Sequence, residues 1–237
     1  MKDLLLPALL WLLALVPARC QTTPNAPAQP RPVAAFHAVN VSSGVELYLV
    51  SGQPAQVAVS ATTPEDRDRI ETTVTNGVLH ISFDHSKAKW DRRAPDKHLR
   101  AYVTADRLTA LTASSGASVQ VKGRYATDSL QIDLSSGASL RADFVTTALS
   151  VRMGSGSDAT LTGHTTRLDV RAGSGSTFNG KDLPAARCQA EASSGATVQL
   201  VAEQTLAATA SSGGSVHYSG AAVASKSASS GGSISHR

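Results

Sequence analysis

A serine–glycine pair recurs at nearly constant spacing through the second half of the chain. Each pair opens a Ser-Gly-small-Ser/Thr/Asp motif, and the seven glycines follow one another at intervals of 18 to 21 residues: Gly116, Gly137, Gly156, Gly175, Gly195, Gly213 and Gly231. A fixed period of this length indicates a solenoid, in which every repeat packs on its neighbours. No long helical pattern interrupts the repeat, so short strands must build it.

Apolar residues stand at fixed offsets from each glycine. Three positions before it lie Ala113, Leu134, Met153, Ala172, Ala192, Ala210 and Ala228, and three after it lie Val119, Leu140, Ala159, Phe178, Val198, Val216 and Ile234. Five positions before it the column is also apolar until Lys226. Apolar residues at every second position are typical of strands with one buried face. The pattern predicts an all-β fold, a single-stranded parallel β-helix with coils of about 18–21 residues.

The serine before each glycine could be interpreted as a catalytic nucleophile. Its seven copies at equivalent positions argue instead for a structural role. By alternation we expect these serines to point inward at the corner, where their hydroxyls can bond to one another along a ladder or to nearby backbone. Outward columns place Asp133 beside Arg152, and Arg171 beside Glu191, one coil apart. A solvated ladder of opposite charges is the simpler interpretation. The alternative is that Arg152 and Arg171 form an anion site.

Two cysteines exclude a disulfide-dense scaffold and a cysteine-rich zinc module. Cys188 occupies an inward column that holds leucine in neighbouring coils, so we expect a buried free thiol. A disulfide to Cys20 is not expected, because Cys20 would have to reach the interior.

A further Ser-Gly turn, distant from the other seven, occurs at Gly44 and predicts that the β-helix begins near Val33. Residues 33–104 are then irregular N-terminal coils and a cap, and residues 105–237 are the regular repeats. Asn76-Gly77 between two alternating segments predicts a β-hairpin that covers the open end of the stack.

Residues 84–98 are the most charged segment. Their candidate ligand-binding side chains are Trp90, Lys87, Lys89, Arg92 and Arg93, since an exposed indole among cations can stack on a sugar. The alternative is a lid in which Trp90 packs down and the charges are solvated. His80, His85 and His98 lack metal-ligand spacing. We therefore predict no metal, no cofactor and no catalytic residue.

The amino terminus has the pattern of a secretory signal over residues 1–19, with a short apolar run and small residues before a cut after Ala18. A Pro-rich linker follows over residues 20–32. Lipid attachment at Cys20 is an alternative and would be the route to a membrane. We predict an extracytoplasmic protein, in the periplasm, on the outer membrane surface or secreted. Its net charge of +4 then favours anionic polysaccharide or envelope partners over nucleic acid.

Residues 33–50, the Val74-Thr75-Asn76-Gly77-Val78-Leu79 segment, residues 99–104 and the Ser-Gly-Ala-Ser repeats together resemble the head GIN domain family. These are exported bacterial proteins described as auto-transporter adhesins. The resemblance covers residues 33–237 and implies a right-handed parallel β-helix with no established activity. The Gly-Ser-Gly-Ser corners at Gly156 and Gly175 depart from the family pattern.

The leading functional hypothesis is a non-enzymatic envelope or surface module, adhesin-like, that binds glycan or protein through repeated polar ridges. Residues 233–237 would leave a strand edge through which copies could associate. The rival is a polysaccharide lyase or hydrolase, which needs clustered carboxylates. Asp133, Asp143, Asp158, Asp169 and Asp182 mostly occupy different columns. A structural or stress-accessory role in the envelope is a third hypothesis.

Overall fold

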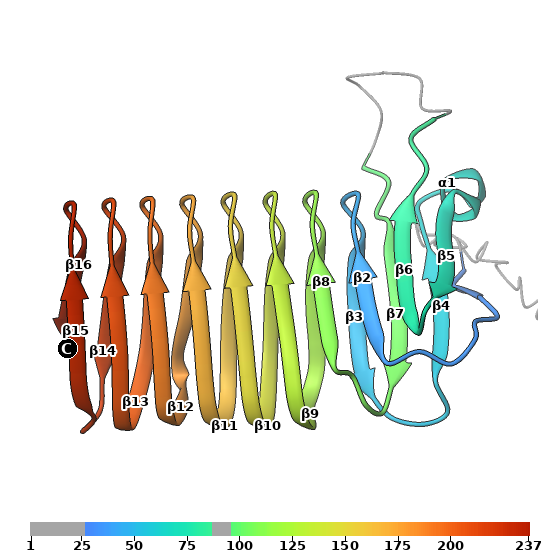
Figure 1. Cartoon of the computed structure of the whole chain (residues 1–237). Coiled ribbons are helices and arrows are strands. Elements are labelled where there is room, and N and C mark those ends of the chain that lie inside the picture. The colour runs from blue at the N-terminus through green and yellow to red at the C-terminus, as the bar shows by residue number, and fades with distance from the viewer. Residues whose placement is uncertain (1–26, 87–95) are drawn as a thin grey trace, which may run out of the picture.

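The computed structural model describes residues 27–86 and 96–237, and Figure 1 shows a row of stacked coils. The predicted signal peptide and Cys20 lie outside the described residues. The regular coils are formed by β8 (Ala110–Ala113), β9 (Ser118–Leu134), β10 (Ser139–Met153), β11 (Asp158–Ala172), β12 (Thr177–Ala192), β13 (Thr197–Ala210), β14 (Ser215–Ser219), β15 (Val223–Ala228) and β16 (Ser233–His236). Neighbouring coils pair in parallel, so the predicted parallel β-solenoid is confirmed.

Each coil consists of two arms joined by a tight turn. We call the segment that ends at a turn, such as residues 130–134, the front arm, and the segment that follows a turn, such as residues 118–122, the back arm. In each turn the serine has φ between 48° and 61° and the following glycine φ between 67° and 76°. Two consecutive positive φ values define a type I′ turn, which a glycine at the second position favours.

The turn serines do not point inward, which corrects the expected hydroxyl ladder. Ser115, Ser136 and their equivalents are exposed, because a residue in the left-handed region at the tip of a turn projects away from the core. The ladder is formed by the backbone instead. The amide of Gly116 donates to the carbonyl of Ser136 at 2.9 Å, and the same bond links every later pair of neighbouring turns.

The core lies between the two arms and consists mainly of small and branched side chains. Ile132 and Leu134 of the front arm and Val119 and Leu140 of the back arm are at most 3% exposed. Only 4% of the chain is aromatic, so alanine and branched aliphatic side chains fill most of the space between the arms. Threonines close part of the corner opposite the turns, where the buried Thr146 hydroxyl bonds to that of Thr165 at 2.9 Å.

A long insertion follows the first coil. Strands β2 (Ala38–Val41) and β3 (Glu46–Ser51) form the two arms of that coil, and the Gly44 amide donates to the Ser115 carbonyl, as in every other turn. The inserted residues form β4 (Gln56–Ser60), α1 (Pro64–Asp68), β5 (Ile70–Thr75), β6 (Val78–Phe83) and β7 (Arg100–Ala105). The assignment of Gly44 to the repeat is therefore confirmed.

The insertion caps the amino-terminal end of the stack (Figure 1). Strands β5 and β6 are the predicted hairpin, with φ of 52° at Asn76 and 73° at Gly77, and β6 extends the front arm beside β2. Helix α1 was not predicted, although Thr63 caps it and Pro64 begins it, which are ordinary helix-start residues. No helix in the described part of the chain is long and apolar enough to span a membrane.

The end of the expected linker takes part in the fold. Gln29–Pro30 forms β1, which pairs antiparallel with Val59 and Ala58 of β4. The Arg31 guanidinium also donates to the carbonyl of Arg67 at 3.2 Å. Proline is tolerated here because an edge strand can leave one side of its backbone unpaired. Over these residues the structure differs from a free linker.

The carboxy-terminal end has no comparable cap in the described residues. Ala228 is exposed, and Lys226 occupies the column that is apolar in earlier coils. The Lys226 ammonium lies 4.7 Å from the centre of the Tyr218 ring, and His236 meets the same ring edge-on at 4.9 Å. A charge at an inward position of a terminal strand discourages edge-to-edge pairing. Association of copies through residues 233–237 stays a prediction.

We expect Lys226→Val to strengthen end-to-end self-association, because it removes the charge that another copy would have to bury. Sedimentation velocity over a range of protein concentrations measures the effect. Lys181→Val, on an exposed corner of β12, is the matched control. Equal self-association of the two variants would contradict the assigned role of Lys226.

Substitutions at two glycines, Gly137 and Gly163, measure the cost of backbone strain apart from the cost of steric overlap. At Gly137, with φ of +73°, an added Cβ meets nothing within 4 Å, so Gly137→Ala should cost only the left-handed penalty of about 1–2 kcal/mol. At Gly163, with φ of +110°, the Cβ would lie 2.0 Å from the carbonyl oxygen of Phe144. Gly163→Ala should therefore lower the free energy of unfolding by clearly more. Urea denaturation measures both losses, and similar values would refute this ranking.

Candidate functional site

The predicted binding side chains Trp90, Lys87, Lys89, Arg92 and Arg93 lie outside the described residues. The residues on either side of them are well anchored. The Arg69 guanidinium donates to the carbonyl of Asp84, and Lys97 is ion-paired with Asp66. The Thr62 hydroxyl donates to the carbonyl of Asp96 at 2.8 Å.

The same two cations cover the ring of Phe83, at 4.6 Å for Arg69 and 5.2 Å for Lys97. Both ends of the 84–98 segment are thus fastened to the cap beside α1. Its role as a binding site or a lid stays a prediction. Among the residues the structure describes, no group of three His, Cys, Asp or Glu side chains could hold a metal ion.

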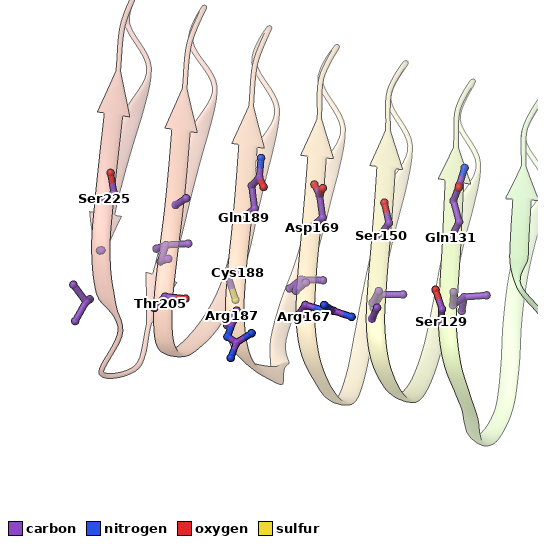
Figure 2. Close-up of a pocket in the computed structure, with 18 of the residues that line it drawn as sticks. Ser129, Gln131, Ser150, Arg167, Asp169, Arg187, Cys188, Gln189, Thr205 and Ser225 are labelled. Carbon is purple, nitrogen blue, oxygen red and sulfur yellow. The ribbon is translucent and has the colours of Figure 1, made fainter.

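A groove of about 820 Å³ runs along the front arm, across the coils from β9 to β15 (Figure 2). Two rows of outward residues line it, one from each coil in register. The row nearer the corner holds Ser129, Ala148, Arg167, Arg187, Thr205 and Val223, and the other holds Gln131, Ser150, Asp169, Gln189, Ala207 and Ser225. The small side chains Ala148, Ser150 and Ala207 lie among longer ones and so leave the surface hollow.

Arg167 and Arg187 stand directly opposite each other on β11 and β12. Their neighbours in the row are Ala148 and Thr205, which carry no charge. Within the described ranges neither arginine has an ion-pair partner, and both are exposed. Like charges opposite each other in a sheet are destabilising by some tenths of a kcal/mol. The pair therefore concentrates positive charge at the groove without internal compensation.

Arg152 and Arg171 differ, since both are neutralised. Arg152 lies 3.8 Å from Asp133 on the neighbouring strand, as the sequence predicted. Arg171 stands opposite Glu191 in register, but its guanidinium pairs with Asp169 at 3.5 Å, two residues earlier on its own strand. A second hollow of about 500 Å³, nearer the turns, is lined by Asp133, Arg152, Arg171 and Glu191. The charge-ladder interpretation fits this pair better than the anion site.

Cys188 lies beneath the groove and is a buried free thiol, as predicted. Burial, with a smaller contribution from the Glu203 carboxylate, raises the pKa of its thiol to about 12. The group is therefore neutral at ordinary pH and is a poor nucleophile. It contributes packing to the groove floor.

Two of the outward carboxylates have no carboxylate as a direct ladder partner. Asp143 stands opposite Arg124 and Thr162, and Asp169 stands opposite Ser150 and Gln189. The groove lining offers hydrogen-bonding groups and positive charge.

The sequence contains a signal for this site that the column analysis missed. Arg167 and Arg187 both stand eight residues before a turn glycine, just after the irregular corner. The register shift between β11 and β12 lies at Thr160 to Thr162, before these positions, so the offset from the glycine aligns the two arginines. The columns nearer the turn gave Arg152 and Arg171 instead.

A family model described as "Putative auto-transporter adhesin, head GIN domain" matches residues 35–222. A search of curated protein sequences found no match.

Solved structures with the same architecture include a "putative adhesin" from Bacteroides fragilis, with a TM-score of 0.80 and 16% identity over 91% of this chain and 98% of that one. A "putative adhesin" from Parabacteroides distasonis has a TM-score of 0.69 and 14% identity over 89% and 96%. A "putative lipid binding protein" from the same species has a TM-score of 0.63 and 15% identity over 91% and 98%. At these identities the likeness shows the fold alone.

Alkaline pH should destabilise the protein through Cys188. Its pKa is raised in the folded state from an ordinary 9.0 to about 12, so the stability it contributes is complete below pH 9 and is lost as the pH rises toward 12. Tyr125, whose pKa burial raises from 10.0 to about 12, acts in the same direction. Chemical denaturation across this range measures the loss. Cys188→Ala should make the decline shallower, and an unchanged slope would contradict the assignment.

Proposed function

The chain belongs to the head GIN domain family, and we propose that it is an adhesin-like, non-enzymatic module exported to the cell surface that binds an extended anionic glycan along the front-arm groove. The observation that carries this proposal is the uncompensated pair Arg167 and Arg187 at the groove. Carboxylate or sulfate groups of a polysaccharide are the ligands that guanidinium groups pair with best.

The dimensions of the groove support a chain-like ligand. It extends along the solenoid axis, and each coil presents one residue from each lining row at the strand spacing of about 4.8 Å. Gln131, Gln189 and the serines of the second row offer donors and acceptors for sugar hydroxyls. An elongated polar surface of this kind favours many weak contacts over one deep site.

The charge of the partner follows from the arginine pair. Two like charges on adjacent strands repel each other in the free protein, and a bound anion offsets that repulsion. The net charge of +4 adds a long-range attraction for acidic polymers. For an exported protein the acidic polymer is a surface glycan. The predicted cationic loop would extend the same preference if it binds.

Replacing both arginines tests the proposal. Arg167→Gln/Arg187→Gln should weaken binding of a hexagalacturonate probe about tenfold or more, because charge-assisted hydrogen bonds contribute more than 1 kcal/mol each. Isothermal titration calorimetry with the full chain measures this. Binding by the unsubstituted protein should also weaken as salt is raised.

The matched control is Arg107→Gln/Arg124→Gln, which removes the same charge outside the groove. It should change the affinity much less. Equal losses of affinity in the two double variants would mean that net charge alone, and not the position of the arginines, determines binding. Failure of the unsubstituted protein to bind the charged probe at low salt would overturn the proposal.

A further inference from the structure

The front-arm groove changes in chemistry along the solenoid axis. Toward β9 and β10 its lining rows present hydroxyl and amide groups, and over β11 and β12 they present the charged residues Arg167, Asp169 and Arg187. Over β13 and β15 the lining contains no charged side chain. The outward residues of this last part are Thr205, Ala207, Val223 and Ser225, and Figure 2 shows Thr205 and Ser225 beyond the arginines.

Val223 is the largest apolar side chain in this uncharged part of the groove. It is 80% exposed, more than any other large hydrophobic residue in the described ranges. Thr205 is its direct ladder partner, and Arg187 is the partner of Thr205, so the three residues form one line across β12, β13 and β15. Ala224, the next residue, packs on the core, so alternation directs Val223 outward into the groove.

The exposed apolar surface around Val223 is small. The methyl groups of Thr205 and Ala207 on β13 add to it, and both residues are exposed. Arg187 limits it on one side, and Ser225, the ladder partner of Ala207, limits it on another. Strand β15 pairs with β13 alone among the described strands, so no further strand covers Val223. The surface therefore has room for a group of the size of a methyl, and not for an extended acyl chain.

A polymer bound by the arginine pair also reaches Val223. Val223 lies two strand spacings beyond Arg187, about 9.5 Å along the solenoid axis, and both line the same groove. A glycan that places an acidic group at Arg187 and follows the groove therefore passes over Val223. We propose that this acidic glycan is O-acetylated and that Val223 selects for the acetyl group, with the acetyl methyl packed on Val223 and the ester carbonyl accepting from the Thr205 hydroxyl.

An acetyl ester matches the chemistry of this part of the groove. Its methyl group is apolar, and its carbonyl oxygen accepts hydrogen bonds, for which the hydroxyls of Thr205 and Ser225 are donors. It carries no charge, in agreement with the uncharged lining over β13 and β15. It also leaves the carboxylates of the glycan free to pair with Arg167 and Arg187.

This inference rests on the function proposed above and narrows the class of glycan that the same groove binds. The arginine pair selects for acidic groups, and Val223 selects for a substituent on the sugars that follow them. A polymer with both features is distinguished from an acidic polymer that lacks acetyl groups.

The test compares hexagalacturonate with the same hexasaccharide after partial O-acetylation, by isothermal titration calorimetry with the full chain. Acetylation leaves the number of carboxylates unchanged, so a difference in affinity reports the added groups. The acetylated probe should bind about fourfold more tightly, the gain expected when one methyl group is buried. Val223→Ser should remove this preference, so that both probes bind it with equal affinity. Val223→Ile should retain the preference, because it keeps the apolar surface.

Val50→Ser is the matched control, because Val50 is an exposed valine on β3 of the back arm, outside the groove. It should retain the fourfold preference. Circular dichroism spectra establish that all three variants are folded.

The outcomes separate this inference from the proposed function. If hexagalacturonate binds and its acetylated form binds no more tightly, the acetyl preference is wrong and the role of the arginine pair stands. If neither probe binds at low salt, both are overturned. A preference that Val223→Ser leaves intact would overturn the assignment of Val223. Val223-dependent binding of phosphatidylglycerol vesicles, without a preference between the two probes, would overturn the inference in favour of a lipid ligand.

Discussion

The hydrogen bond from each turn glycine to the serine carbonyl of the next turn is the constraint on which the stack depends. It holds successive coils at one register, and it requires the same pair of positive φ values in every turn. Serine adopts the left-handed region only with a steric penalty, whereas glycine adopts it freely. The glycine therefore lowers the conformational cost of the turn in every coil. With the turn tips aligned, each inward residue packs on the equivalent residue of the neighbouring coil.

Outward residues do not take part in this packing, so their identity can differ from coil to coil and serve function. On the front arm, Arg167 stands opposite Arg187 over a groove, although the two like charges repel each other. On the back arm, Tyr48 and Tyr102 stack on each other near the cap. The scaffold therefore supports binding surfaces whose spacing is set by the backbone ladder and whose chemistry is set coil by coil.

The two ends of the stack are protected in different ways. At the amino-terminal end, β6 and β7 pair with the two arms of the first coil, and β5 pairs with β6 on its far side. The Asp66, Arg69 and Lys97 cluster fastens the ends of the charged segment between β6 and β7. At the carboxy-terminal end, Tyr218 closes the core, with Lys226 and His236 against its ring.

The sequence by itself determined the solenoid, the coil length, the inward columns, the Asn76-Gly77 hairpin and the burial of Cys188, because each depends on local alternation and turn chemistry. It misplaced the turn serines, because alternation does not hold through a type I′ turn. The Arg167–Arg187 pair follows from a shared offset of eight residues before a turn glycine, a column that the sequence analysis did not include. Only the tertiary structure brought Tyr48 of β3 beside Tyr102 of β7. This contact depends on register across the 51–109 insertion, which strand pairing decides and local sequence does not record.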